Sequence, residues 1–547
     1  MGTPLALFLV ALAVRLLLIA SFPDPGYPDS YYYVDVAQAL AAGRGFQIDF
    51  VWVFAEVGGT IPADPTLPIP SNAHWMPLAS LVQVPFIWLL GPTAVASALP
   101  FAILGATAAP LTWAIARDAG ARGYVAVGAG LLVAIPVLVT PFMVQPDNFS
   151  LFQPLVAASL WLGARGLRGS NRSFAAAGLL AGLATLSRND GVLVLAALGL
   201  AFLWSQWRAR RAPATAARLP AISPAAAAAC VALFVLVMAP WWLRQLDVFG
   251  QISPSTASGK VLFLRHIDEW NSIDTPATLE YLLGQGLGPL VVSRILGFVA
   301  AVGVFTTLVA GGLLVPFMVI GGWLRRRSAD VGPFFAYAGL LFAFSALVSA
   351  IHVPGGTFIH SAVALVPHAY ILALEGIVGA VVWMAGRRRT WNVDAAGRIF
   401  VGAAVAFAVL AAVGGTLLVH DRYADKRAQR QAVAATLDAI GVPQADRIMS
   451  IDPSGYRYYT GRGGVVLVRD PLATIEEVGR AYDVRWLVLE RDETVDAAGP
   501  ILEGDLPAWL EAPIYREDTD ADGRLDFGLY PVCFEAHAGC AAPDEPA

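Results

Sequence analysis

The residues best suited to chemistry follow the first apolar segment, where residues 28–33 read Pro-Asp-Ser-Tyr-Tyr-Tyr at the start of a short helical pattern. The carboxylate of Asp29, beside the rings of Tyr31 and Tyr32, could take a proton from a hydroxyl group, because a general base must only lie within hydrogen-bond reach. A structural role is the alternative: Asp29 or Ser30 could cap the helix by accepting a backbone N–H hydrogen bond. Both interpretations stay open on these residues alone.

A second acidic candidate is Asp147, in the Gln-Pro-Asp-Asn stretch of residues 145–148 that precedes a helical pattern. A carboxylate there is favoured by the helix dipole, so capping is again the alternative. If Asp29 and Asp147 approach each other, they could act as a base with an orienting group or as oxygen ligands of a divalent cation, Mg²⁺ or Mn²⁺. No distance between them follows from the sequence, so the cation is a candidate cofactor and none is certain.

A cationic candidate is Arg188, in the Arg-Asn-Asp stretch of residues 188–190 between two short apolar segments. Charges there cost free energy unless they face protein, water or an anion. A guanidinium offers paired hydrogen bonds to phosphate, with Asp190 as a polar neighbour, and an Arg188–Asp190 ion pair is the alternative. His352 and His360 could contact a polar headgroup, and the favoured alternative is that each is a histidine at the membrane boundary with its hydrogen bonds satisfied. Their spacing is not that of zinc ligands.

The composition places these residues in a membrane protein. The chain has 547 residues, of which 57% are hydrophobic and only 14% charged, which excludes an ordinary soluble domain, and nothing indicates a nucleic-acid partner. About eleven transmembrane helices are predicted from apolar runs of about 20 residues. These runs lie near residues 4–22, 94–116, 123–142, 149–164, 174–187, 191–206, 221–242, 290–322, 333–351, 361–385 and 398–419.

Arg and Lys cluster in alternate loops, at residues 117–122, 165–172, 208–211, 325–327 and 387–389, which the positive-inside rule places in the cytoplasm. This alternation requires residues 76–90 to be a half-inserted or interfacial helix, which makes residues 23–93 one large outer loop. The polar candidates then lie on the outer side of a cell membrane.

From residue 420 onward charges become frequent and the apolar runs shorten to strand length. Residues 446–451, 464–468 and 485–490 are typical of strands, with a helix ending near Tyr482 between the last two. The sequence therefore predicts a transmembrane catalytic domain at residues 1–419 and a small extracytoplasmic α/β domain at 420–547. Cys533 and Cys540 could pair in an oxidising compartment or stay reduced.

Four stretches in order resemble the GT-C glycosyltransferases of the protein mannosyltransferase and aminoarabinose transferase type. They are residues 28–46, the His-Trp-Met-Pro-Leu of 74–78, the acid in 145–148 and the Gly-Leu-Leu-Ala-Gly-Leu-Ala-Thr-Leu-Ser-Arg-Asn-Asp-Gly of 178–191. The resemblance covers residues 1 to about 210 well and the remainder in outline.

The resemblance implies an inverting enzyme that takes a sugar from a polyprenyl-phosphate donor among the membrane lipids and transfers it to an acceptor, a lipid, glycan or protein. Asp29 matches the family's acid thought to deprotonate the acceptor, and Arg188 matches a cationic position that could hold the leaving phosphate. Ser30 stands where many members have Glu, which gives more weight to Asp147. Tyr31, Tyr32, His74, Asp190 and His360 are expected as further substrate contacts.

Two other classes share these helices. A transporter or flippase of lipid-linked sugars would carry charged residues near the bilayer midplane and often repeated halves, and neither is evident. A non-catalytic glycan-binding membrane partner would tolerate loss of Asp29 but would require residues 420–547.

Overall fold

The computed structural model describes residues 2–211, 221–252, 260–388, 390–518, 521, 523–535, 537 and 539–540. Its contacts divide the chain into two compact units. The first consists of Met1–Pro25, Trp75–Arg244 and Val291–Asp421, and the second of Gly26–His74, Gln245–Leu290 and Arg422–Ala547.

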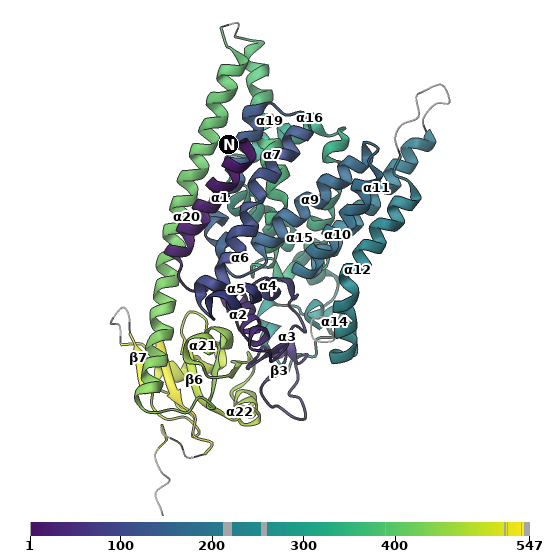
Figure 1. Ribbon diagram of the computed structural model, residues 1–547. Coiled ribbons are helices and arrows are strands. Elements are labelled where there is room, and N and C mark those ends of the chain that lie inside the picture. Colours follow the sequence, from purple (N-terminus) through teal and green to yellow (C-terminus); the bar gives the residue numbers. More distant parts are fainter. Residues whose placement is uncertain are drawn as a thin grey trace, which may run out of the picture. The chain divides into compact units, whose positions relative to one another are not determined.

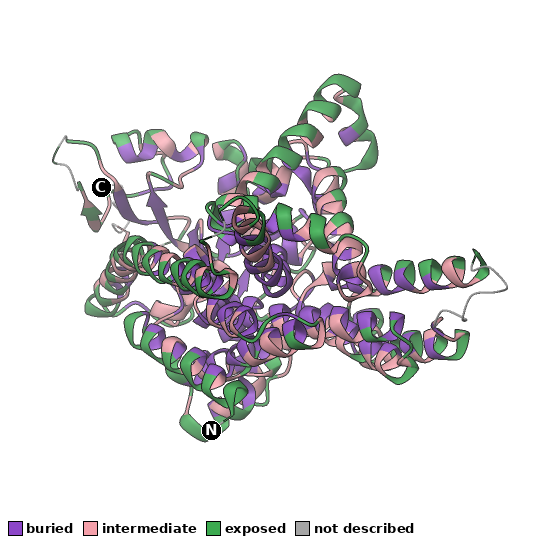
Figure 2. Ribbon diagram, turned by 90° about the horizontal axis from the view of Figure 1, so that it is seen from above, coloured by how far each residue is buried: buried purple, intermediate pink, exposed green. Residues whose placement is uncertain are grey.

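The first unit is helical (Figure 1). The longer helices that lie wholly or largely within it are α1 (Thr3–Ser21), α6 (Ala94–Ala106), α7 (Ala108–Asp118), α8 (Gly123–Ala134), α9 (Phe149–Leu167), α10 (Asn171–Ser187), α11 (Val192–Arg211), α12 (Pro224–Phe249), α15 (Leu287–Val304), α16 (Val315–Arg325), α17 (Gly332–Leu347), α19 (Val366–Ala385) and α20 (Val393–Ala439). Many of these helices carry both exposed and buried residues along their length, green and purple in Figure 2. Helices α16 and α19 cross closely at two glycines. A Cβ at Gly321 or Gly376 would lie 1.8 Å or 1.9 Å, respectively, from the backbone of the other helix, so a side chain at either position would prevent this crossing.

Within the described residues, 8 helices are long and apolar enough to cross a membrane, or 9 when a bent pair counts as one span. The predicted count of about eleven is therefore roughly matched. Helices α9 and α10 form where spans were expected but fall outside this set. The run at 290–322 is not one span, because α15 passes into a π-helical turn (Phe305–Val309) and α16 begins separately at Val315.

The bent pair joins α8 to the 3-10 helix η1 (Val137–Val144) at 56°, where the sequence predicted one continuous span at 123–142. Pro136 has no N–H to donate and disfavours helical backbone in the residue before it. Arg15 of α1, only 1% exposed, compensates part of the break: its Nη1 lies 3.5 Å from the carbonyl oxygen of Ala134. The sequence prediction had given this buried arginine no role.

The short apolar segment at 76–90 forms two helices, α4 (Leu78–Leu81) and α5 (Val84–Leu90). Neither is long enough to cross a bilayer, as the sequence predicted. Its position at the membrane interface stays a prediction.

The second unit is built on a six-stranded sheet with the order β2-β5-β4-β6-β8-β7. The strands are β2 (Phe50–Val51), β4 (Arg447–Ser450), β5 (Gly464–Val466), β6 (Val484–Glu490), β7 (Tyr515–Glu517) and β8 (Phe527–Pro531). The first four in spatial order pair in parallel, and β8 and β7 are antiparallel. Helices α21 (Pro453–Thr460) and α22 (Leu472–Ala481) connect the parallel strands, so the predicted C-terminal α/β region is confirmed.

Strand β2 comes from the predicted first outer loop, which the sequence had placed with the membrane domain. Phe50 and Val51 pair with Gly464 and Val465 of β5, so residues 26–74 fold with the C-terminal segment. The same unit contains α2 (Pro28–Ala41), α3 (Val53–Glu56), and a two-stranded ribbon of β1 (Gln47–Ile48) and β3 (Ile69–Pro70). Residues 26–74 of the predicted outer loop are thus an integral part of the α/β unit.

Candidate functional site

In the first unit, Asp147 is fully buried in the turn between η1 and α9. Its Oδ2 lies 3.2 Å from Nδ1 of His360. The imidazole ring of His360 also stacks on Phe149, with ring centroids 4.2 Å apart. The carboxylate and the imidazole are therefore held together, and the aromatic ring two residues after Asp147 fixes the plane of the imidazole.

Arg188 and Asp190 form the ion pair that the sequence left open. Nε of Arg188 lies 3.0 Å from Oδ1 of Asp190, and the two side chains are 15% and 9% exposed. The other carboxylate oxygen of Asp190 accepts a hydrogen bond from Ser361, and Nη2 of Arg188 lies 3.5 Å from the carbonyl oxygen of Thr357. The Arg188–Asp190 pair is therefore partly shielded from water, and it contacts a further segment of the chain that contains Thr357 and Ser361.

The segment that contains Thr357 and Ser361 is the short helix α18 (Thr357–Ala362). Its consecutive residues His360 and Ser361 contact Asp147 and Asp190 respectively, so α18 joins both acidic groups into one polar cluster, which we call the α18 cluster. Gly356, with φ of 96°, supplies the left-handed backbone ahead of the helix that a side chain would disfavour. The sequence prediction missed Ser361, whose signal is its position beside His360 after two glycines.

In the second unit, Asp29 lies in the first turn of α2 and is partly buried. The capping contacts there belong to Ser30: its Oγ accepts from the backbone N–H of Tyr27 at 3.2 Å and donates to the carbonyl of Tyr27 at 2.7 Å. Ser30 thus has the structural role that was considered for either residue. The role of Asp29 as a base stays a prediction.

Tyr31 and Tyr32 are packed in the interior of this unit, with 2% and 0% exposure. The ring of Tyr31 lies 5.3 Å from that of Tyr458, and the hydroxyl of Tyr32 accepts a hydrogen bond from the backbone N–H of Asn72 at 2.6 Å. These neighbours give both rings a packing role that fixes α2, and their expected role as substrate contacts stays a prediction. His74 is partly exposed and meets Trp270 edge to face, with centroids 5.4 Å apart.

Asp35 of α2 is a buried acid whose protonation should change the free energy of unfolding of the protein. Burial raises its pKa from the usual 3.8 to about 6, although Arg457 acts in the opposite direction. The folded state therefore binds this proton more tightly than the unfolded chain does. The stabilisation that protonated Asp35 gives to the folded state is complete below about pH 4 and is lost as the pH rises through 6.

We expect the free energy of unfolding to fall by on the order of 3 kcal/mol over this window because of Asp35. In Asp35→Asn the decline should be smaller, measured as the midpoint of thermal unfolding in detergent between pH 4 and 7. The exposed Asp505 offers the control Asp505→Asn, which should keep the wild-type slope. An unchanged slope in Asp35→Asn would contradict the assignment.

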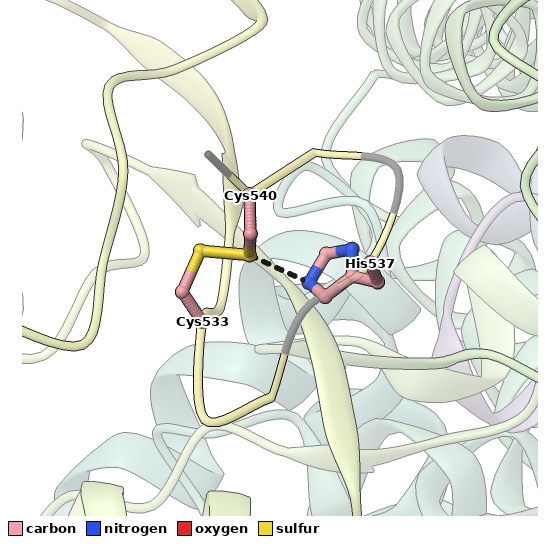
Figure 3. A group of neighbouring side chains, drawn as sticks. All are labelled: Cys533, His537 and Cys540. Atoms are coloured by element: carbon pink, nitrogen blue, oxygen red, sulfur yellow. Dashed lines mark hydrogen bonds between the residues drawn. A yellow bond between two sulfur atoms is a disulfide. The ribbon is translucent and has the colours of Figure 1, made fainter. Parts of the chain in front are cut away.

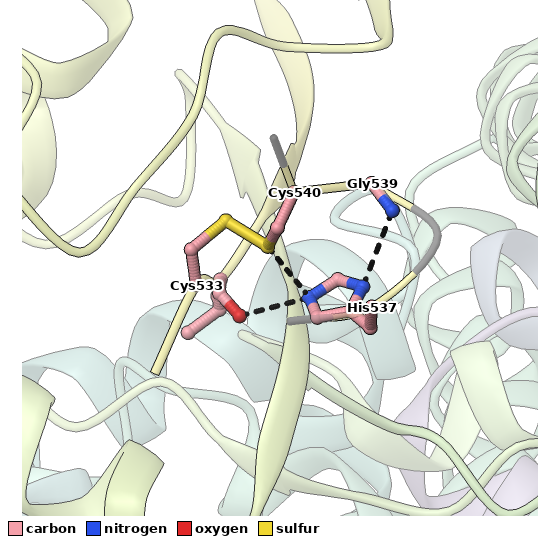
Figure 4. Close-up of a disulfide and its surroundings, with 5 residues drawn as sticks. Cys533, His537, Gly539 and Cys540 are labelled. Atoms are coloured by element: carbon pink, nitrogen blue, oxygen red, sulfur yellow. Dashed lines mark hydrogen bonds between the residues drawn. A yellow bond between two sulfur atoms is a disulfide. The ribbon is translucent and has the colours of Figure 1, made fainter. Parts of the chain in front are cut away.

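Cys533 and Cys540 form a disulfide, and His537 lies beside it (Figure 3). The imidazole Nε2 is 3.1 Å from the sulfur of Cys540 and 2.9 Å from the carbonyl oxygen of Val532, while Nδ1 accepts from the backbone N–H of Gly539 (Figure 4). Sulfurs joined to each other are not the thiolates that a zinc site requires. The pairing left open by the sequence is therefore resolved in favour of the disulfide.

A divalent cation would need oxygen ligands in larger number than the α18 cluster provides by itself. Asp147 and His360 supply one carboxylate and one imidazole nitrogen 3.2 Å apart. The residue types fit a partial ligand set, and dependence on Mg²⁺ or Mn²⁺ stays a proposal.

The sequence and the fold were compared with those of known proteins. Residues 73–242 match the family model of dolichyl-phosphate-mannose-protein mannosyltransferases. The structure of ArnT from Cupriavidus metallidurans bound to undecaprenyl phosphate superposes with a TM-score of 0.54 at 15% identity, covering 96% of this chain and 97% of ArnT. The chain is a multi-pass membrane protein whose fold is similar to that of ArnT.

A second solved structure, archaeal oligosaccharyltransferase AglB from Archaeoglobus fulgidus in complex with an inhibitory peptide and a dolichol-phosphate, superposes with a TM-score of 0.50 at 14% identity. It covers 96% of this chain and 74% of AglB. A comparison with curated proteins finds no match. The segment that matches the family model contains His74, Asp147, Arg188 and Asp190.

Proposed function

We propose that the protein transfers a sugar from a polyprenyl-phosphate-linked donor to an acceptor at the outer face of the cell membrane, with inversion at the anomeric carbon. The observation that carries this proposal is the α18 cluster, in which a partly buried guanidinium lies in the segment that matches a family of lipid-phosphate-dependent sugar transferases. The structural neighbours ArnT and AglB were solved with undecaprenyl phosphate and dolichol-phosphate respectively, which supports a donor of the same chemical class.

In the proposed reaction the Asp29 carboxylate takes the proton of the acceptor hydroxyl, whose oxygen attacks the anomeric carbon from the side opposite the phosphate. The bond between that carbon and the phosphate oxygen breaks as the new glycosidic bond forms. Arg188 is assigned to the leaving phosphate, because preorganised cationic donors stabilise charge that develops in the transition state. Asp147 orients the acceptor or contributes a ligand to a divalent cation, which would neutralise phosphate charge.

The direct test is transfer of radiolabelled sugar from a panel of polyprenyl-phosphate sugars, using membranes that contain or lack the protein. We expect transfer with at least one donor and a product of inverted anomeric configuration. Absence of transfer with every donor would contradict the proposal and favour a transporter or a glycan-binding partner, and retention of configuration would contradict the single-displacement mechanism.

The disulfide supports an extracytoplasmic location of the second unit, because disulfides persist in oxidising compartments and are rare in the cytosol. We expect Cys533 and Cys540 in intact spheroplasts to resist a membrane-impermeant maleimide until an impermeant reductant is added, and then to react. Cys230, a buried free thiol in α12, is the internal control and should stay unlabelled in both conditions. Labelling of Cys533 and Cys540 only after the membrane is permeabilised would place this unit in the cytoplasm.

A further inference from the structure

The buried side chain of Arg430, from the C-terminal part of α20, lies against the helix that carries Asp29. Its guanidinium carbon is 5.0 Å from the ring centre of Tyr31, two residues after Asp29. Nη2 of Arg430 lies 2.6 Å from Oδ2 of Asp452, and these two side chains are 6% and 2% exposed. The first turn of α2 is thus packed on a buried ion pair from the C-terminal segment.

Asp452 connects this ion pair to the backbone next to Asp29. Its Oδ1 accepts from the backbone N–H of Gly455 at 3.0 Å, which caps α21. The hydroxyl of Ser454 lies 2.6 Å from the same oxygen and 3.2 Å from the carbonyl oxygen of Pro28. A hydroxyl of the α/β unit therefore lies within hydrogen-bond distance of the residue that directly precedes the proposed base.

The remaining surroundings of Arg430 are shaped to hold the guanidinium in one place. The ring of Tyr456 lies 5.6 Å from it, and the hydroxyl of Tyr456 donates to Glu490 at 2.8 Å. A Cβ at Gly455 would lie 2.7 Å from the guanidinium carbon, so any side chain at this position would displace Arg430. Buried guanidinium groups between aromatic rings and a carboxylate are strongly oriented.

A second arginine of the same unit holds α2 further along. Arg457 of α21 lies 2.8 Å from a carboxylate oxygen of Asp49 and 3.8 Å from one of Asp35. The side chain of Arg457 is 21% exposed, so its ion pairs are weaker than the buried Arg430–Asp452 pair. Arg430 is the more deeply buried of the two arginines, and it contacts the first turn of α2 through Tyr31.

We propose that Arg430 is a positioning residue, which holds the first turn of α2 and thereby the Asp29 carboxylate on the C-terminal α/β unit. This inference rests on the proposed function of Asp29. In this proposal residues 422–547 contribute to sugar transfer by positioning Asp29, and they do so without binding a glycan themselves. Deleting the C-terminal segment would then abolish transfer in a true enzyme, so that deletion does not distinguish an enzyme from a non-catalytic partner.

The test compares Arg430→Met with Arg462→Met in the full-length protein. Arg462 is an equally suitable buried arginine, with 1% of its side chain exposed, and it bonds Asp438 and the carbonyls of Val442, Pro443 and Thr460 but no residue of α2. Two readouts are used: amide hydrogen exchange of residues 28–41, and kcat and KM for the lipid-linked donor at a temperature where both variants are folded.

We expect Arg430→Met to speed exchange in α2 at least tenfold and to lower kcat by about ten- to a hundredfold, because small displacements of a reacting group have effects of this size. The KM for the donor should change less than about twofold, and Arg430→Lys should recover part of kcat because it retains the charge beside Asp452. Arg462→Met should leave both α2 exchange and kcat at wild-type values.

Equal exchange of α2 in the two methionine variants would overturn the proposal, as would a loosened α2 with unchanged kcat. If Arg430→Met does not fold, Tyr456→Leu removes a ring beside the guanidinium while keeping the Arg430–Asp452 pair, with Tyr456→Phe as its control, and the same outcomes apply. If the wild type transfers no sugar from any donor, the proposed function fails, and the exchange comparison alone decides whether Arg430 anchors α2.

Discussion

Replacement of Asp29 by asparagine is expected to lower the rate of sugar transfer by about 10²- to 10⁴-fold, the range that a general base contributes. Asparagine keeps the size and shape of the side chain but cannot take the acceptor's proton. Because Ser30 already makes the capping contacts to Tyr27, α2 should fold normally in this variant. The measurement is the initial rate of transfer at matched expression, with thermal unfolding to verify the fold.

The matched control is Asp64→Asn, which removes an exposed carboxylate from the same predicted outer loop and should leave the rate unchanged. A wild-type rate in Asp29→Asn would move the base elsewhere. Asp147→Asn would then be the next variant, because Asp147 is the buried acid of the α18 cluster.

The second large effect is expected at Arg188, where methionine should lower kcat by about 10²- to 10³-fold through the lost stabilisation of the leaving phosphate. Lysine should give an intermediate rate, because it supplies a point charge without the planar pair of donors. Arg172→Met, at the exposed start of α10, removes a cation from the same helix and should leave kcat unchanged.

Loss of Arg188 also leaves the mostly buried Asp190 without its ion-pair partner, which destabilises a protein independently of catalysis. The double variant Arg188→Met/Asp190→Asn separates the two effects. It removes the unpaired charge while keeping an oxygen that can accept from Ser361, so thermal stability should recover and transfer should not. Recovery of both would show that Arg188 serves only as a structural ion pair.

The sequence by itself determined the features that depend on short stretches of chain. Runs such as Thr3–Ser21 and Pro224–Phe249 are apolar over the length of a bilayer span, and this property needs no knowledge of neighbours. The strands β4, β5 and β6 were predictable for the same reason, since their apolar residues and flanking turns are local. The acidic start of α2 and the Arg-Asn-Asp stretch were found because polar residues beside membrane spans stand out.

Only the tertiary structure decided which of these stretches meet. The parallel pairing of β2 with β5 assigns residues 26–74 of the predicted outer loop to the α/β unit, although hydropathy had grouped that loop with the spans. Ser361 meets Asp190 across 171 residues of sequence, and Arg430 meets Tyr31 from the far end of the chain. Such contacts depend on how whole elements pack and on which buried charges find partners, so no local pattern of residues encodes them.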